Sequence, residues 1–296
     1  MNMSKRMKRR ALTRKDAAYL QWRYLRNAAR TLRAWQARWK YDDHAKEVAQ
    51  EIVDRGIVMG PAESYLSDEG RKALADACAM VLQLSESDEV RSMLANGAAA
   101  DNKDYLVHVV PWEMQHVPDS PLLKLALDTK LLEIVSAYLG MWPWLHAVGA
   151  WLNFPTQQEA KESQLWHRDP DDLKVIKVFI YIKDVGAENG PFCYIPKTHP
   201  FGSGSGILPV HKAKKRILDD EMVTAIPQDN WISCTGPANT MIIADTVGYH
   251  RGGKPTEGSR LLITFSYTSG TPLSRRVLQV QKRPDWIKHP IQAYAL

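Results

Sequence analysis

The feature that most constrains the fold is a change in sequence pattern at Gly140. Before this residue, long stretches have the apolar spacing of amphipathic helices. After it, short runs rich in β-branched and aromatic residues alternate with glycine and proline: AVGAWLNF, LKVIKVFIYIKDV, GPFCYIP, NTMIIADT and RLLITFSYTS. Many short strands are typical of a sandwich or barrel. Helices followed by strands predict an α+β fold, a mainly β core buttressed by N-terminal helices.

Three helices are predicted between residue 41 and this change. The first lies near 43–55 and the second covers 68–84, capped by the serine that precedes it. The third is predicted as one continuous helix over 121–139. Ser120 would be its N-cap, a proline occupies its first position, and Gly140 stops it.

The first 40 residues carry the positive charge of the chain. They hold 13 of the 39 Lys/Arg and one of the 33 Asp/Glu, so the rest of the chain is net acidic. We expect residues 1–13 to be disordered and residues 14–40 to form a basic amphipathic helix. Its apolar stripe comprises Trp22, Leu25, Ala29, Leu32 and Trp39, with Trp35 close by.

Three roles for this helix stay open. It docks its aromatic stripe on the body and leaves its arginines in solvent, or it lies on an anionic membrane surface, or it binds nucleic acid or an acidic protein. The acidic body argues against nucleic acid as a partner.

Other features point to a cytoplasmic protein. If the helix lies on a membrane surface, the protein would contact the inner face of the membrane peripherally. No run of about 18 apolar residues exists, and no apolar signal core follows the basic N-terminus. The three cysteines are odd in number and widely spaced, which suits a reducing compartment.

A candidate metal site begins in the segment QLWHRDPDD, which precedes a strand. His167 and Asp169 are two residues apart, so in an extended segment their side chains point to the same side. In the strand that follows, Lys177 and Phe179 share a mixed face that could line a pocket, while the other face is aliphatic. An imidazole and a carboxylate pointing together can hold a divalent metal, but they need a third ligand.

His250 has the most suggestive setting among the remaining histidines. It follows a strand and opens a glycine-rich loop, and Arg260 begins another strand ten residues later. Two histidines and one carboxylate form the facial triad of non-haem Fe(II) oxygenases, which leaves positions open for cosubstrate and dioxygen.

The ordered set WHRD, NGPFCYIPKTHP, DTVGYHRGG and an arginine ten residues beyond the last histidine resembles the phytanoyl-CoA dioxygenase family. These are Fe(II)- and 2-oxoglutarate-dependent oxygenases on a double-stranded β-helix, a jelly-roll or cupin-like core. The resemblance covers roughly residues 100–270. It implies a single dioxygenase domain over residues 41–296, with the tail of residues 1–40 outside it.

Carried over by position, the resemblance implies that His167, Asp169 and His250 bind Fe(II). Arg260 would pair with the distal carboxylate of 2-oxoglutarate, for which a planar guanidinium is well suited. Thr246 and Asn153 are further candidates to face the cosubstrate. The expected reaction hydroxylates an aliphatic C–H of a small organic molecule with O2, and succinate and CO2 are the coproducts.

Asp169 favours hydroxylation over halogenation, because related halogenases have a small residue at the carboxylate position. The substrate class stays open among a lipid, a glycan precursor and a secondary metabolite, and the sequence predicts no oligomeric state.

Two other functions stay open. One is a jelly-roll binding module whose metal site is vestigial or holds zinc, and the other is an oxidative nucleic-acid demethylase. Arg168 and Arg251 are expected to balance local charges, with an anionic substrate as their alternative partner. Trp151 and Trp166 are expected to be packing residues rather than a substrate platform, and His199 is expected to be structural.

Overall fold

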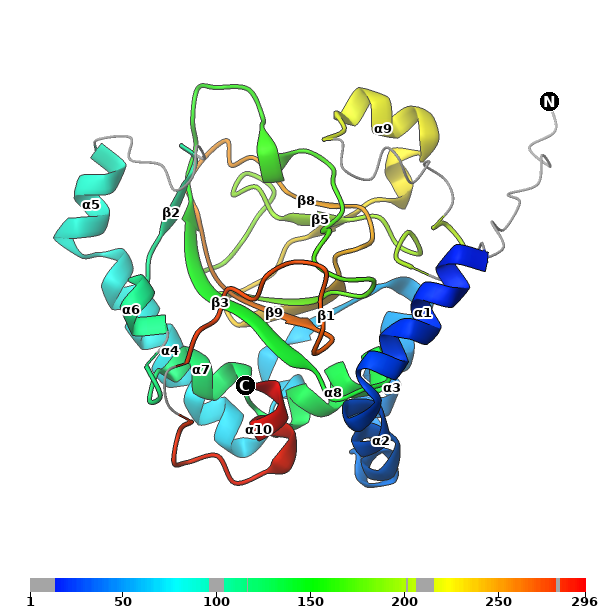
Figure 1. Ribbon diagram of the computed structural model, residues 1–296. Coiled ribbons are helices and arrows are strands. Elements are labelled where there is room, and N and C mark those ends of the chain that lie inside the picture. The colour runs from blue at the N-terminus through cyan, green and yellow to red at the C-terminus, as the bar shows by residue number, and fades with distance from the viewer. Residues whose placement is uncertain (1–13, 96–103, 116, 201, 206–215, 281–282) are drawn as a thin grey trace, which may run out of the picture.

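The computed structural model describes residues 14–95, 104–115, 117–200, 202–205, 216–280 and 283–296. Two antiparallel sheets form its centre (Figure 1). The larger sheet has the order β1-β7-β4-β9-β3-β2 and the smaller has the order β6-β5-β8. Their bounds are β1 Ile57–Pro61, β2 Leu106–His108, β3 Trp144–Asn153, β4 Ile176–Tyr181, β5 Phe192–Tyr194, β6 Ile232–Cys234, β7 Thr240–Asp245, β8 His250–Gly252 and β9 Arg260–Thr268.

Helices cover one side of the larger sheet, where α3, α4, α7 and α8 lie (Figure 1). The bounds of the α-helices are α1 Arg14–Arg26, α2 Ala28–Ala37, α3 Asp43–Arg55, α4 Asp68–Ser85, α5 Asp88–Ala95, α6 Trp112–Gln115, α7 Pro121–Ala126, α8 Thr129–Leu139, α9 Asp219–Ala225 and α10 Pro290–Ala295. Short 3-10 turns occupy Arg38–Lys40, Ala62–Tyr65, Glu162–Gln164 and Gln228–Asn230. The predicted α+β class, with helices buttressing a sheet core, is confirmed.

The alternation of side chains in β4 divides the interior into two parts. Ile176, Val178 and Ile180 join the large aliphatic core between the sheet and the helices. Lys177 and Phe179 point to the opposite face, toward the smaller sheet, where they line a cavity. One face of the larger sheet therefore stabilises the fold by apolar burial, and the other face is available for a site.

Two of the three helices predicted in the body are confirmed, and the third is wrong as a single element. α3 and α4 occupy the predicted ranges, and the hydroxyl of Ser67 accepts a hydrogen bond from the Gly70 N–H at 3.1 Å. The predicted helix over 121–139 breaks into α7 and α8. The carboxylate of Asp128 accepts from the Leu131 N–H at 3.0 Å and so caps a new helix, whereas Ser120 makes no cap hydrogen bond.

The predicted helix over residues 14–40 is also interrupted, at Asn27. The amide of Asn27 donates to the Arg23 carbonyl at 2.8 Å and to the Thr271 hydroxyl at 2.9 Å, which fixes the chain between α1 and α2. The expected disorder of residues 1–13 lies outside the described part of the chain.

The orientation of these two helices reverses the expectation of a docked aromatic stripe. Arg23 is only 4% exposed and lies 3.6 Å from the carboxylate of Asp172, and Arg30 donates to the Pro143 carbonyl at 2.8 Å. The body offers a buried carboxylate and free carbonyls at this place, so polar side chains face inward. Apolar side chains that are 53% to 74% exposed face outward: Trp22, Leu25, Leu32, Trp35 and Trp39.

Within the described residues, none of the helices combines the length and apolar character needed to cross a membrane. The cysteines Cys78, Cys193 and Cys234 are all free, as their number and spacing predict.

Candidate metal and cosubstrate site

The three predicted metal ligands come together through backbone pairing. His167 and His250 face each other in an antiparallel bridge, with N–H to carbonyl distances of 2.9 and 3.0 Å. The Asp169 N–H donates to the Thr246 carbonyl at 2.9 Å, which extends the same pairing by two residues. The segment before β4 and the start of β8 therefore present three side chains to one point, although the histidines are 83 positions apart in the sequence numbering.

Each imidazole has one nitrogen committed and one available. The Nδ1 of His167 lies 2.8 Å from the Leu165 carbonyl, and the Nδ1 of His250 lies 3.0 Å from the Gly248 carbonyl. Because a carbonyl only accepts, both Nδ1 atoms carry hydrogen and both Nε2 atoms keep a lone pair. Burial, and for His167 also the neighbouring imidazole, lowers the pKa of both histidines, so both rings are neutral, as metal ligands must be.

The available ligand atoms form one compact group. The Nε2 atoms of His167 and His250 lie 3.9 and 3.6 Å from carboxylate oxygens of Asp169, and all three candidate ligand atoms lie within 4.8 Å of one another. The group could therefore hold one divalent ion. Burial would raise the pKa of Asp169, but the neighbouring ammonium of Lys177 opposes burial and holds this pKa well below its usual range.

Arg260 provides a buried cation in the same cavity. The residue is 4% exposed, and its Nε and Nη1 have no hydrogen-bond partner among the described residues. Asn153 is its direct partner in the pairing of β3 with β9, and both residues line the cavity. A buried guanidinium without an acceptor is costly unless a ligand completes it, so this end of the cavity fits a carboxylate.

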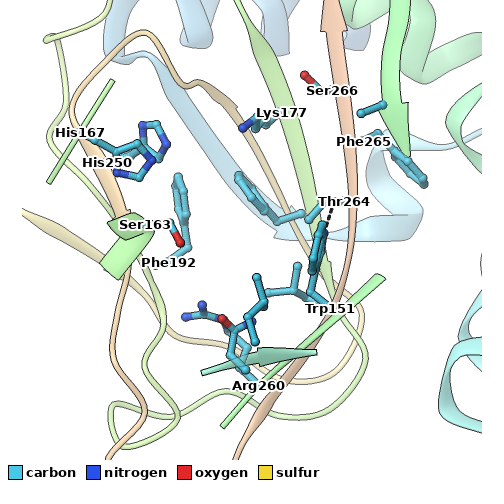
Figure 2. A pocket seen from close by; sticks show the side chains of 16 residues that line it. Trp151, Ser163, His167, Lys177, Phe192, His250, Arg260, Thr264, Phe265 and Ser266 are labelled. Carbon is cyan, nitrogen blue, oxygen red and sulfur yellow. Dashed lines mark hydrogen bonds between the residues drawn. The ribbon is translucent and has the colours of Figure 1, made fainter. Parts of the chain in front are cut away.

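The cavity has a volume of about 270 Å³, and side chains from one face of β3, β9 and β4 line it. Directly paired residues of neighbouring strands share a face, so the register of these strands decides which side chains lie beside each other in the lining. Figure 2 shows Arg260 at one end of the cavity, Lys177 and Ser266 toward the other, and the two imidazoles at one side. Trp151 lies between these ends, and Phe179 pairs with Thr264, which lies between Arg260 and Ser266 along β9.

The structure separates the remaining predicted residues into two groups. Trp151 lines the cavity and donates from its indole to the Thr264 hydroxyl at 3.2 Å, and it also packs against a buried hydrophobic cluster, as expected. Thr246 is fully buried and is not among the described residues that line the cavity. Its hydroxyl lies 3.5 Å from the Val175 carbonyl, and its own carbonyl accepts a hydrogen bond from the Asp169 N–H.

Other polar residues near the ligands have structural partners. Arg168 donates to the Thr198 carbonyl at 2.8 Å and lies over the Tyr249 ring. Arg251 pairs with Asp219 and lies over Trp166, which is fully buried. The pair of Arg251 with Asp219 supports the predicted charge balance and the burial of Trp166 supports packing, whereas Arg168 contacts a carbonyl and an aromatic ring. His199 is likewise buried, with its Nε2 3.0 Å from the Val53 carbonyl.

Lys177 and Ser266 were not predicted as site residues. The alternating pattern of β4 placed Lys177 on the pocket-facing side, which is a usable signal. Nothing in the sequence pairs it with Ser266, because that contact depends on the register between β4 and β9.

Comparison with known families identifies the chain. The model of the phytanoyl-CoA dioxygenase (PhyH) family matches residues 61–237, more than half of the chain. The chain belongs to the phytanoyl-CoA dioxygenase family. The match includes His167 and Asp169 and ends before His250 and Arg260, which the fold brings to the same cavity. As a member of the PhyH family, the protein is a non-haem Fe(II)/2-oxoglutarate-dependent oxygenase.

Solved structures with a similar fold include AviO1 from Streptomyces viridochromogenes Tue57, with 18% identity and a TM-score of 0.50, covering 77% of this chain and 96% of that one. EctD from S. alaskensis, solved with 2-oxoglutarate and 5-hydroxyectoine, has 18% identity and a TM-score of 0.47, with 75% and 74% covered. HygX from Streptomyces hygroscopicus, solved with nickel, 2-oxoglutarate and hygromycin B, has 15% identity and a TM-score of 0.46, with 84% and 99% covered. No curated protein matches the chain by sequence.

Proposed function

We propose that this PhyH-family protein hydroxylates an aliphatic C–H bond of a small organic molecule, with His167, Asp169 and His250 as the Fe(II) ligands. The bound iron supplies dioxygen activation coupled to oxidative decarboxylation of 2-oxoglutarate, so one oxygen atom enters the substrate hydroxyl and the other enters succinate, with CO2 released. Residues 41–296 act as one domain in this proposal, because helices and larger sheet share one hydrophobic core.

One observation carries the proposal: the buried guanidinium of Arg260, whose Nε and Nη1 have no hydrogen-bond partner among the described residues, lines the same cavity as His167 and His250. A hydrolytic zinc site has no use for a buried cation at this place, whereas a dicarboxylate cosubstrate needs one. Arg260 would bind the distal carboxylate in a charge-assisted pair, and Asn153 beside it would orient the same group.

The aromatic residues of the cavity serve the reaction by limiting water. Trp151 and Phe179 line the wall between the cationic ends, and Phe192 stacks on the His250 ring at a centroid distance of 5.7 Å. An apolar wall beside the metal ligands favours an aliphatic substrate and keeps competing oxidation low.

The test is succinate formation by the Fe(II)-loaded protein with 2-oxoglutarate and O2. We expect His167→Ala and His250→Ala each to lower the rate at least about 100-fold, because each removes a metal ligand. His44→Ala, which removes an exposed histidine of α3, is the matched control and should leave the rate unchanged. Retained iron without succinate in the unmodified protein would refute the oxygenase proposal and favour a binding module.

We also infer that the outward apolar side chains of α1, α2 and the following turn contact an anionic lipid bilayer. This apolar stripe, defined as Trp22, Leu25, Leu32, Trp35 and Trp39, is flanked by exposed cations at Arg26, Arg33, Arg38 and Lys40. The two helices lie along one edge of the molecule (Figure 1). Helices that lie on a membrane typically place tryptophan at the membrane–water interface and arginine against the phospholipid headgroups.

Membrane contact is tested by sedimentation with vesicles. We expect binding to phosphatidylglycerol vesicles that weakens with salt, little binding to phosphatidylcholine vesicles, and loss of binding in the Trp35→Ser, Trp39→Ser double variant. Trp112→Ser, at a tryptophan of α6 that is 49% exposed, is the control. The proposal fails if the double variant binds vesicles as the unmodified protein does. It also fails if the two substitutions abolish self-association or nucleic-acid binding in place of vesicle binding. Together with three free thiols, such binding supports a cytoplasmic location at the inner face of the membrane.

A further inference from the structure

The end of the cavity opposite Arg260 contains a second cation that the proposed reaction leaves unassigned. Lys177 of β4 pairs directly with Ser266 of β9, and Ser266 in turn pairs with Ala147 of β3. All three side chains line the cavity. Arg260 and Ser266 are six residues apart on one strand, so the two cationic ends are separated by roughly 20 Å of backbone.

Ser266 and Lys177 differ in how well they are paired. Ser266 is 5% exposed, and its hydroxyl has no hydrogen-bond partner among the described residues. The Nζ of Lys177 lies 2.7 Å from a carboxylate oxygen of Asp169, its only ion pair in the described part of the chain. Asp171 acts on this ammonium electrostatically but forms no ion pair with it there. A buried hydroxyl without a partner and an ammonium beside it are suited to an oxygen ligand.

Among the metal, its ligands, Arg260 and the cosubstrate, Lys177 is an additional cation, and Asp171 is the carboxylate outside this set that acts on it electrostatically. The two imidazoles are neutral, so the double charge of Fe(II) and the charges of Asp169 and Arg260 sum to two positive charges. The two carboxylates of 2-oxoglutarate balance these. The ammonium of Lys177 then adds one positive charge in a cavity with an aromatic wall, where an uncompensated charge is unfavourable.

We propose that Lys177 and Ser266 form a subsite for an anionic oxygen group of the substrate, a carboxylate or a phosphate ester. The substrate then has an apolar part, which lies against Trp151 and Phe179, and a negative group beside Asp169. Because Lys177 contacts a metal-ligand carboxylate, the oxidised carbon lies close to the anionic group in the substrate. This assignment rests on the proposed oxygenase function and narrows its substrate class.

The test measures binding of small probes by calorimetry to protein loaded with Fe(II) and saturating 2-oxoglutarate without O2. Butyrate and butyl phosphate supply the two anionic groups, and butyramide is the neutral analogue. We expect at least one anion to bind more tightly than the amide. Lys177→Met should weaken anion binding roughly tenfold or more, and Ser266→Ala should weaken it less. Lys183→Met, which removes an exposed lysine just after β4, is the matched control and should have no effect.

Two outcomes overturn the subsite. The first is an unmodified protein that binds butyramide as well as both anions. The second is a Lys177→Met protein that still binds the anions more tightly than butyramide. If its Fe(II) affinity falls while this anion preference stays, Lys177 is a positioning residue for Asp169 and not part of a substrate subsite. Failure of the proposed function is seen separately, because Fe(II) or 2-oxoglutarate would then not bind before any probe is added.

Discussion

Replacing Arg260 with methionine should strengthen the unliganded fold and weaken cosubstrate binding at the same time. The guanidinium is 4% exposed and has two nitrogens without a partner among the described residues, so it destabilises the protein until a carboxylate arrives. Methionine has a similar length and no charge. Such replacements of buried ionic groups are neutral or stabilise by about 1–4 kcal/mol.

The loss of binding follows from the same contact. Removing one partner of a buried, hydrogen-bonded charge pair costs about 2–5 kcal/mol, which weakens 2-oxoglutarate binding roughly 30-fold or more. At a concentration 100 times its dissociation constant, a ligand stabilises the unmodified protein by about 2.7 kcal/mol. At the same concentration, Arg260→Met would gain at most about 0.9 kcal/mol.

Thermal unfolding of the metal-loaded protein measures both effects. For a chain of this size, the ligand should raise the Tm of the unmodified protein by roughly 4 °C and that of Arg260→Met by roughly 1 °C. Arg275→Met, which removes an exposed arginine, is the control and should keep the full shift. A full ligand-dependent shift in Arg260→Met would refute the assignment of this residue to the cosubstrate carboxylate.

Three further predictions follow from the same structure. Gly252→Ala should weaken 2-oxoglutarate binding without unfolding the protein. The added Cβ would lie 2.9 Å from Nη2 of Arg260, so the flexible end of this side chain must shift from the position in which it binds the carboxylate. Unchanged affinity by calorimetry would contradict this. His250→Ala should lower Fe(II) affinity at least roughly tenfold in an equilibrium dialysis assay, since one of three ligands is lost; retained affinity would place the metal elsewhere. Burial lowers the pKa of Lys174 to about 8. The unfolded chain therefore binds more protons between about pH 8 and pH 10.5, and stability should rise through that window by up to about 3 kcal/mol. Lys174→Met should flatten this rise in denaturant titrations, and an unchanged slope would contradict the burial argument.

Local signals in the sequence were sufficient for much of the fold. Gly140 adopts a left-handed conformation with φ of 71° and ends α8, as predicted from its position. The alternation in β4 assigned its aliphatic face to the core and its mixed face to the cavity. The break at Asp128 was missed because its carboxylate is also fixed from a distance, by the hydroxyl and N–H of Ser67.

The site shows the same division between local and tertiary information. The spacing of His167 and Asp169 and the setting of His250 pointed to a metal site, and the resemblance to the phytanoyl-CoA dioxygenase family assigned the three side chains to it together. Thr246 was expected to face the cosubstrate, but its hydroxyl points to the Val175 carbonyl, a matter of rotamer that sequence does not report. Lys177 meets Ser266 only through strand register.

Helical periodicity defines two opposite faces of the basic tail without saying which face meets the body, so docking of the apolar face was only one of three roles left open. Arg23 and Asn27 are buried instead, because their partners, Asp172 and Thr271, come from distant segments. The exposed apolar face is the surface for which we propose the bilayer as partner.

The most direct test of the central claim is a crystal structure grown without O2 in the presence of Fe(II) and 2-oxoglutarate. The account predicts one metal ion bonded to Nε2 of His167, Nε2 of His250 and a carboxylate oxygen of Asp169, with the distal carboxylate of 2-oxoglutarate on the guanidinium of Arg260. A metal ion bound away from these three side chains, or a cosubstrate carboxylate that does not reach Arg260, would contradict it.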